Sequence, residues 1–180
     1  MDINHDGLLD QNDLVYQGSS DPLIYGGIQN TFTWKNLSLK AYFSYSLGGK
    51  IYNLSEFWNG SGTRAYNKYR YLLDSWHPVR NPESDIPRAG YEDLVGNDRM
   101  IYDASYIRLK ELSLSYRFNM PARVKWCRNI VLGFSAENVW LWKNYAGFDP
   151  DVSTSSAARR IDTASFPRPR TYVFNINFTY

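Results

Sequence analysis

The side chains best placed to do chemistry are the oxygen donors of residues 2–13, DINHDGLLDQND. Counted from Asp2, oxygen-bearing side chains occupy positions one, three, five, nine and twelve, and Gly7 occupies position six. This spacing is typical of a calcium loop, because the oxygens recur on one side of a tight coil and glycine permits the sharp turn. The predicted ligands are Asp2, Asn4, Asp6, the backbone carbonyl of Leu8, Asp10 and Asp13.

Two features of this segment leave a metal-free alternative open. Asp13 stands where the calcium loop of an EF-hand has Glu, and the shorter Asp side chain reaches less far toward an ion. Loops rich in Asp and Asn also form without metal, through hydrogen bonds from their side chains to their own backbone. The sequence therefore predicts Ca²⁺ as a cofactor, with a self-bonded turn as the alternative.

Aromatic side chains form the second candidate site. They make up 17% of the chain, so its apolar content is concentrated in rings, which suit surfaces between apolar and wet surroundings. Residues 49–103 contain many such rings and no sustained periodicity, and loops of this length usually carry function. We expect ligand or partner contacts from Trp58, Tyr66, Trp76 and Tyr91; the alternative is that these rings pack the loop against itself.

Catalysis and nucleic-acid binding have no support in the sequence. The chain lacks HExxH, GxSxG and phosphate-loop motifs, and its two histidines, His5 and His77, fall in expected loops. Cys127 is the only cysteine, which excludes a disulfide framework and a thiolate metal cluster. The net charge is only +2, with the basic residues scattered along the chain, so no electrostatic footprint for nucleic acid is present. We therefore predict a protein that is not an enzyme.

The elements that must position these loops are β-strands. In the final segment, RTYVFNINFTY, every second residue is aromatic or aliphatic, and most of the intervening residues are amides or hydroxyls. Because side chains on a strand point to opposite faces with period two, one face of such a strand is apolar. The same alternation predicts strands at about residues 23–34, 37–48, 104–118, 129–143 and 170–180.

Three local features interrupt the alternation. The pair Gly26-Gly27 suggests a bulge or a close backbone approach within the first strand. Asn138 breaks the pattern of the fourth strand before Trp140 and Trp142. Residues 63–74 show the spacing of a short amphipathic helix inside the long loop.

The predicted fold class is all-β, and two settings suit strands with one apolar face: a sheet over a protein core, or a membrane barrel. The turns alternate between short and long, as in membrane barrels, and the polar faces carry Lys, Glu, Arg, Asn and Ser, which suit a watery lumen. These features favour an antiparallel up-and-down transmembrane β-barrel. The alternative is a secreted, calcium-dependent β-sandwich binding module, similar to a lectin.

Aromatic rings also lie at strand ends, where a membrane barrel has its interfacial girdles. These rings are Trp34, Tyr45, Tyr116, Trp140 and Trp142.

The order of several segments resembles the C-terminal end of SusC/RagA-type TonB-dependent outer-membrane transporters of Bacteroidetes. They follow the family's order almost from end to end of the chain, although Asp151 stands where the family often has Glu. The matching segments are DINHDGLLDQND, DPLIYGGIQNTFTWKNLSL, SWHPVRNPESDIPR, DASYIRLKELSLSYRF, AENVWLWKNYAGFDPDV and FPRPRTYVFNINFTY.

The resemblance implies that residues 1–180 are the C-terminal part of a plugged barrel in the outer membrane, with about five of about 22 strands. It also implies external loops at residues 1–22, 49–103 and 144–169, and short turns on the periplasmic side. The implied partners are a SusD-like surface lipoprotein, outer-membrane lipid, a glycan or peptide substrate, and TonB, which acts through an N-terminal part outside this chain.

The start of the chain carries no signal-peptide pattern. Met1 is followed at once by Asp2, Asn4 and Asp6, with no basic region and no apolar run. Either the protein is cytosolic or the natural chain begins further upstream, and the resemblance implies the second.

Overall fold

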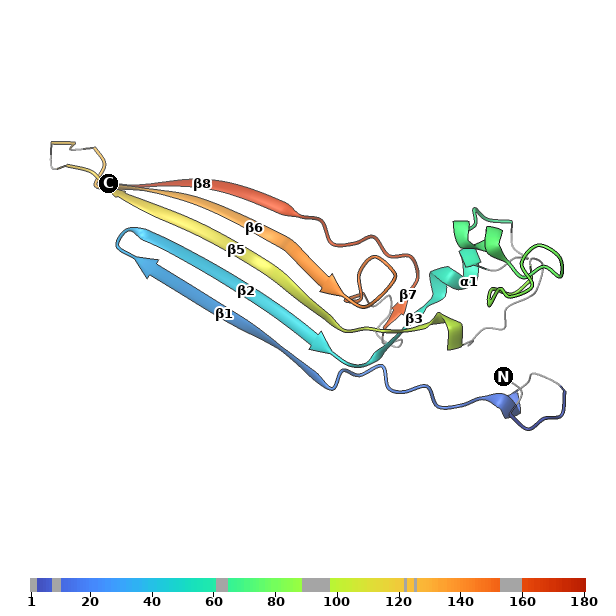
Figure 1. Cartoon of the computed structure of the whole chain (residues 1–180). Coiled ribbons are helices and arrows are strands. Elements are labelled where there is room, and N and C mark those ends of the chain that lie inside the picture. Colours follow the sequence, from blue (N-terminus) through green and yellow to red (C-terminus); the bar gives the residue numbers. More distant parts are fainter. Residues whose placement is uncertain are drawn as a thin grey trace.

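The computed structural model describes residues 3–7, 11–60, 65–88, 98–121, 123–124, 126–152 and 160–180 (Figure 1). Five long strands form one antiparallel sheet, which we call the wall, in the spatial order β1-β2-β5-β6-β8. Each of these strands lies beside the preceding one in chain order, so the wall is an up-and-down meander. The predicted all-β antiparallel fold is confirmed. The strands are β1 (Ile24–Trp34), β2 (Leu37–Leu47), β5 (Tyr106–Asn119), β6 (Asn129–Lys143) and β8 (Thr171–Thr179).

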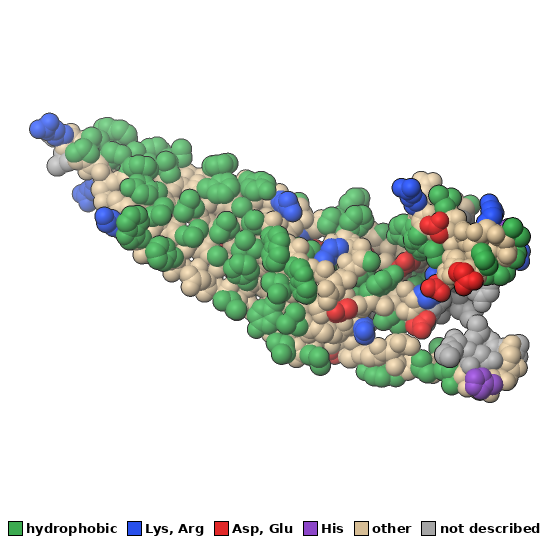
Figure 2. Space-filling view, viewed as in Figure 1, with side chains coloured by type: hydrophobic (Ala, Val, Ile, Leu, Met, Phe, Trp, Pro, Cys, Tyr) green, Lys and Arg blue, Asp and Glu red, His purple; other side chains and the backbone are tan. Residues whose placement is uncertain are grey.

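The pairing register gathers the apolar residues of all five strands on one side of the wall, the apolar face. Directly paired residues point to the same side of a sheet, and one such row crosses the wall as Phe32, Leu39, Leu114, Phe134 and Phe174. This face stays exposed, with Phe174 at 79% of its full accessibility. Figure 2 shows hydrophobic side chains spread along the length of the wall. No second sheet among the described residues covers them, which removes the sandwich interpretation.

The opposite side of the wall, the wet face, carries polar residues in the same register. One row runs through Thr33, Ser38, Ser115, Gly133 and Asn175. Gly133 leaves room there for the Asn175 side chain, which would collide with a Cβ at that position. One face of the wall therefore suits lipid, and the other suits water.

The glycine pair of β1 makes room for two tyrosine rings of β2. A Cβ at Gly26 would lie 2.8 Å from the Tyr45 hydroxyl, and a Cβ at Gly27 would lie 2.8 Å from the Tyr42 ring and hydroxyl. The β1–β2 register runs without a shift from end to end, so the bulge suggested at Gly26-Gly27 is wrong. The close approach is real, but side chains rather than backbone make it.

The irregularities of the wall lie instead at Lys110 of β5 and at Asn138 of β6, where Asn138 has a positive φ of 53° and the predicted break in the pattern is confirmed. Tyr42 pairs with Glu111, while the next residue of β2, Phe43, pairs with Leu109. The register on the other side of β5 also shifts between Leu109 and Glu111. The extra residue turns Arg108 onto the wet face, opposite Ser44.

The long loops at one end of the wall form a small ordered unit, which we call the cap (residues 49–60, 65–88, 98–105, 144–152 and 160–165). It contains a second sheet in the order β4-β3-β7, from β3 (Lys50–Asn53), β4 (Ile101–Asp103) and β7 (Ile161–Asp162). Its core consists of Ile51, Ala104 and Tyr145, with Tyr102 and Val152 packed against them. Three short helices complete it: α1 (Leu54–Gly60), η2 (Arg70–Asp74) and η3 (Asp98–Met100).

The helix expected at residues 63–74 is wrong for its described part, because residues 65–69 are irregular and only the 3₁₀-helix η2 follows. The α-helix of the cap begins earlier, at Leu54, directly after β3. Near the N-terminus a further 3₁₀-helix, η1, spans Gln11–Asp13. No helix in the described ranges is long and apolar enough to cross a membrane.

The two ends of the wall differ in Figure 1. The cap and the N-terminus lie at one end, and the C-terminus lies at the other with the two short turns, β1–β2 and β5–β6. Strands β1 and β8 are the outer strands, and within the described residues each pairs along one edge only. The wall therefore has two open edges as well as an exposed apolar face.

We predict that the isolated 180-residue chain does not form a soluble monomer in aqueous buffer. Open edges and an exposed apolar face are both penalised in water, and they promote aggregation. Size-exclusion chromatography and denaturant unfolding after refolding, with and without detergent, measure this. A soluble, monomeric product that unfolds cooperatively without detergent would contradict the prediction.

Candidate functional site

Of the predicted calcium ligands, the structure describes Asn4, Asp6 and Asp13. Asp2, Leu8 and Asp10 lie outside the described residues. The Asn4 side chain contacts Asp6 twice: its Oδ1 accepts from the Asp6 amide at 3.1 Å, and its Nδ2 donates to Asp6 Oδ2 at 2.8 Å. Asp13 Oδ1 accepts from the Ile3 amide at 2.7 Å, which ties the end of the loop to its start. Gly7 has a positive φ of 82°.

This arrangement is compatible with a calcium loop and with a self-bonded turn. The side-chain donors are hard oxygens, the ligands that Ca²⁺ prefers, and the loop closes on itself as an ion-binding coil must. The bonds to the Asp6 and Ile3 amides also close it without an ion. In the described part of the chain, no three His, Cys, Asp or Glu residues gather closely enough to hold a metal.

The structure brings two of the four predicted aromatic contact residues together on the cap. Trp58 of α1 packs edge-on against Tyr66, with ring centroids 6.2 Å apart, and both side chains are exposed. Trp76 is exposed too, and its indole Nε1 donates to the Pro82 carbonyl at 3.1 Å. Tyr91 lies outside the described residues. These rings are therefore partly exposed to solvent and partly packed within the cap.

His77, which the sequence places in a loop, helps to shape that loop. Its Nδ1 accepts hydrogen bonds from the amides of Val79 and Arg80 at 3.2 and 3.3 Å, and its backbone bridges to Asn81. The imidazole thus holds a turn of the cap rather than facing a reacting group.

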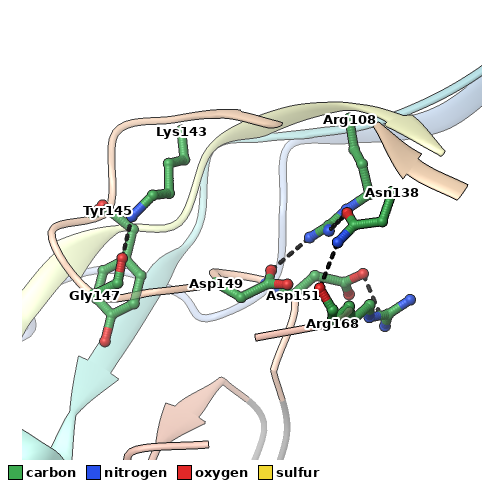
Figure 3. A network of polar contacts seen from close by, with 8 residues as sticks. All are labelled: Arg108, Asn138, Lys143, Tyr145, Gly147, Asp149, Asp151 and Arg168. Carbon is green, nitrogen blue, oxygen red and sulfur yellow. Dashed lines mark hydrogen bonds and ion pairs between the residues drawn. The ribbon is translucent and has the colours of Figure 1, made fainter. Parts of the chain in front are cut away.

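A network of polar contacts joins the wall to the cap (Figure 3). Arg108 of β5 is 1% exposed, and its Nη2 lies 2.5 Å from Asp149 Oδ1 in a buried ion pair. Its Nη1 donates to Asn138 Oδ1 at 2.5 Å, and Asn138 Nδ2 donates to the Arg168 carbonyl at 2.6 Å. The network thus reaches from the cap end of β5, the middle strand of the wall, to the segment that leads into β8.

Asp149 and Asp151 form ion pairs with two different arginines. Asp149 pairs with buried Arg108 and also accepts from the Asp151 amide at 2.9 Å. Asp151 Oδ2 pairs with Arg168 Nη2 at 3.0 Å, in a partly exposed position. The two carboxylates of Asp149-Pro150-Asp151 thus form structural ion pairs with two arginines.

The segment after β6 is fixed to the wall and the cap by further contacts. Lys143 Nζ donates to the carbonyls of Tyr145 and Gly147, and Asn144 Nδ2 donates to Asp103 Oδ2 at 2.9 Å. Tyr145 is 2% exposed, and its hydroxyl donates to Asp162 Oδ2 at 2.7 Å. Burial and this hydrogen bond raise the pKa of Tyr145, so its hydroxyl stays a donor.

A second polar cluster lies around Glu56 of α1. The Tyr102 hydroxyl donates to Glu56 Oε2 at 2.5 Å, and the Tyr71 hydroxyl donates to Oε1 at 3.3 Å. Burial and the Glu56 charge raise the pKa of Tyr71 to about 12. Burial and the Glu56 hydrogen bond likewise raise the pKa of Tyr102. The cap is therefore braced by phenol–carboxylate bonds that persist at neutral pH.

Sequence reasoning missed the Arg108 network. Arg108 and Asp149 lie 41 residues apart in the sequence. The alternation did not assign Arg108 to either face of the sheet. The available signal was the phase of β5, in which apolar residues are even-numbered from Leu112 onward but odd-numbered at Leu109 and Ile107. That slip marks the bulge that turns Arg108 inward.

The wall and its loops have the features of one segment of a barrel: an up-and-down meander, an apolar and a wet face, short turns at one end and an ordered cap at the other. No family model matches the chain. The chain is nevertheless homologous to TonB-dependent receptors over nearly its whole length, which confirms the resemblance to a SusC/RagA-type segment.

Among curated proteins, TonB-dependent receptor P26 of Formosa agariphila is 32% identical over 191 aligned residues, which cover 99% of this chain and 19% of that receptor. Receptor P3 of the same organism is 28% identical, covering 99% of this chain and 18% of that receptor. The chain thus spans about a fifth of the length of the curated relatives it matches.

Among solved structures, the RagAB peptide transporter matches with a TM-score of 0.78 and 28% identity, covering 91% of this chain and 18% of that chain. The RagAB peptide importer in its open-open state matches with a TM-score of 0.74 and 29% identity, covering 90% of this chain. The wall and the cap therefore have a counterpart in a solved transporter.

We predict that Asp149→Asn destabilises the folded protein by about 3–5 kcal/mol, because it leaves the Arg108 cation buried without a counter-ion. The matched control is Glu111→Gln, which breaks the Lys40–Glu111 pair on the wet face. That pair has an Nζ–Oε2 distance of 3.1 Å and side chains 35% and 33% exposed. Exposed pairs of this kind contribute about 0–1 kcal/mol. Denaturant unfolding in detergent measures both, and equal effects would contradict the prediction.

Proposed function

We propose that this chain is the C-terminal wall of an outer-membrane, TonB-dependent transporter that imports glycans or peptides and has no enzymatic role. The observation that carries the proposal is a match to TonB-dependent receptors along 99% of the chain, in a sheet with one exposed apolar face and one polar face. In such a wall the apolar face contacts lipid and the wet face lines the lumen.

The chain supplies only part of the transporter, because it matches about a fifth of each relative. We assign the plug and the contact with TonB to other parts of the complete protein. The open edges of β1 and β8 pair with further strands of the same barrel, since a closed barrel is the form in which strands satisfy their backbone groups in lipid.

We assign the cap to the outer surface of the cell, where it meets a SusD-like lipoprotein and the substrate. The cap is an ordered unit with its own core, so it can present fixed side chains to a partner. Trp58, Tyr66 and Trp76 are exposed there, and aromatic rings stack on sugars or pack against peptide side chains. We extend the same role to Tyr91, which belongs to the same loop, residues 49–103.

We predict that Trp58→Ala and Trp76→Ala in the complete transporter each weaken substrate uptake severalfold without lowering the amount of barrel in the membrane. Each change removes a stacking surface while leaving the wall intact. Trp126→Ala is the matched control, because Trp126 is exposed in the β5–β6 turn at the opposite end of the wall. Uptake of labelled oligomers and immunoblots of outer membranes provide the measurements. Parallel loss of uptake and barrel level would show that the rings only pack the cap.

We also propose that the loop at residues 2–13 binds Ca²⁺ on the same outer side as the cap. Support comes from the hard oxygen donors and from the Asp13–Ile3 bond that closes the loop. The ion would add charge-assisted contacts to a loop that already closes through its own amides.

We predict that Ca²⁺ protects the loop at residues 2–13 of the complete transporter from proteolysis, and that Asp6→Asn combined with Asp13→Asn removes this protection. Asparagine keeps a hydrogen-bond acceptor for the Ile3 amide but removes two negative charges from the ion site. Limited proteolysis of this loop in Ca²⁺ and in chelator, for both proteins, is the measurement. Identical cleavage of the unchanged protein in both conditions would rule the ion out.

A further inference from the structure

Two neighbouring cavities lie between the wet face of the wall and the cap. Their volumes are about 560 and 550 Å³, enough for several residues of an oligomer, and both are lined by Asp21 and Arg160. The first also meets Asp151 and Arg168, and the second also meets tyrosines of the wall. Arg160 therefore stands where the two cavities adjoin.

The Arg160 guanidinium is held by neutral acceptors. Its Nη2 donates to Ser46 Oγ at 2.7 Å, and its Nη1 lies 3.4 Å from the Gly48 carbonyl. Gly49 provides the space, because a Cβ there would lie 2.9 Å from Nη1. These contacts fix the orientation of the side chain without neutralising its charge.

The other two arginines at this junction are neutralised. Arg108 pairs with Asp149, and Arg168 pairs with Asp151. Arg160 forms no ion pair with any carboxylate of the described ranges. Oriented by neutral acceptors and without a direct ion pair, the Arg160 guanidinium is available to an anion that enters from the lumen.

The lining of the second cavity complements an oligomer that carries such an anion. Tyr25, Tyr42 and Tyr106 line it, together with Ser44 and Ser46, so it offers ring faces and hydroxyls around the Arg160 charge. Aromatic faces and hydroxyl groups bind sugar rings and peptide groups alike.

We propose that Arg160 anchors a substrate subsite that binds a carboxylate group of the transported oligomer. A planar guanidinium matches a carboxylate with two parallel hydrogen bonds. The tyrosines and serines of the second cavity leave neutral groups beside that carboxylate. The carboxylate comes from an acidic peptide or from a uronic-acid oligosaccharide. The inference rests on the proposed transport function.

The test uses the purified complete transporter with its lipoprotein partner and two oligomer mixtures, a protein digest and a pectin digest. Each mixture is offered as such and after methyl esterification of its carboxyl groups, and mass spectrometry identifies what is bound. We expect at least one mixture to show roughly tenfold enrichment of carboxylate-bearing oligomers, lost on esterification. Which mixture shows it identifies the source of the carboxylate.

Three variants make the test specific. Arg160→Gln should abolish the enrichment while neutral oligomers still bind, and Arg160→Lys should restore part of it, because it keeps the charge but not the planar fork. Arg168→Gln is the control and should keep the enrichment, since Arg168 is already paired with Asp151.

Two results would overturn the inference and leave the transport function standing. The first is unchanged enrichment in Arg160→Gln. The second is equal binding of free and esterified oligomers by the unchanged protein. If Arg160→Gln instead lowers barrel level and leaves the charge preference intact, Arg160 pairs with another part of the barrel and the subsite is refuted. Binding of none of the four mixtures would overturn the proposed function together with the subsite.

Discussion

The buried ion pair between Arg108 and Asp149 is the interaction on which the arrangement of wall and cap depends. A charged guanidinium that is 1% exposed is tolerated only with a counter-ion and good hydrogen-bond geometry. Asp149 meets this requirement from the segment after β6, and Asn138 adds a bond from within the wall. Asp149 also accepts a hydrogen bond from the Asp151 amide, so the Arg108–Asp149 pair fixes the backbone at Asp151. Asp151 in turn pairs with Arg168. The Arg108–Asp149 pair is the most deeply buried of the contacts between the wall and the cap, which also include the Arg160–Ser46 and Gly48–Ser105 hydrogen bonds.

The wall imposes a second constraint through its surroundings. Its cross-strand rows place rings and aliphatic groups on one side and amides, hydroxyls and the Lys40–Glu111 pair on the other. A sheet with this division needs an apolar medium on one side and water on the other. The only extensive core among the described residues belongs to the cap, around Ile51 and Tyr145. The chain thus combines a surface that is stable in lipid with a small unit that is stable in water, and the junction between them is where the buried charges lie.

The sequence predicted the parts of this structure that follow from local periodicity. Alternation alone is enough to assign which side chains of β8 share a face, because the period of a strand does not depend on its neighbours. The bulge at Lys110 was missed, although the apolar residues of β5 change phase there, because only the pairing with β2 and β6 shows that an inserted residue causes the change. Likewise, the cap core joins Ile51, Ala104 and Tyr145 from three distant segments. The helix expected at residues 63–74 was wrong for a related reason. Its side chains contact distant parts of the cap, as in the hydrogen bond from Tyr71 to Glu56, and do not form one face of a helix.

The three arginines at the junction illustrate how structural and functional charges differ. Arg108 is buried and must be neutralised, because an unpaired charge in that position would cost several kcal/mol. Arg168 is partly exposed, and its ion pair with Asp151 holds the irregular segment that leads into β8. Hydrogen bonds to Ser46 and Gly48 fix the orientation of the Arg160 side chain, as in a structural residue. Unlike Arg108 and Arg168, it forms no ion pair with a carboxylate of the described residues. Fixing a cation with neutral acceptors costs side-chain entropy and contributes little Coulomb energy in return. Such an arrangement is favourable when an anion supplied from outside completes it, and the cavities on either side of Arg160 give that anion a path.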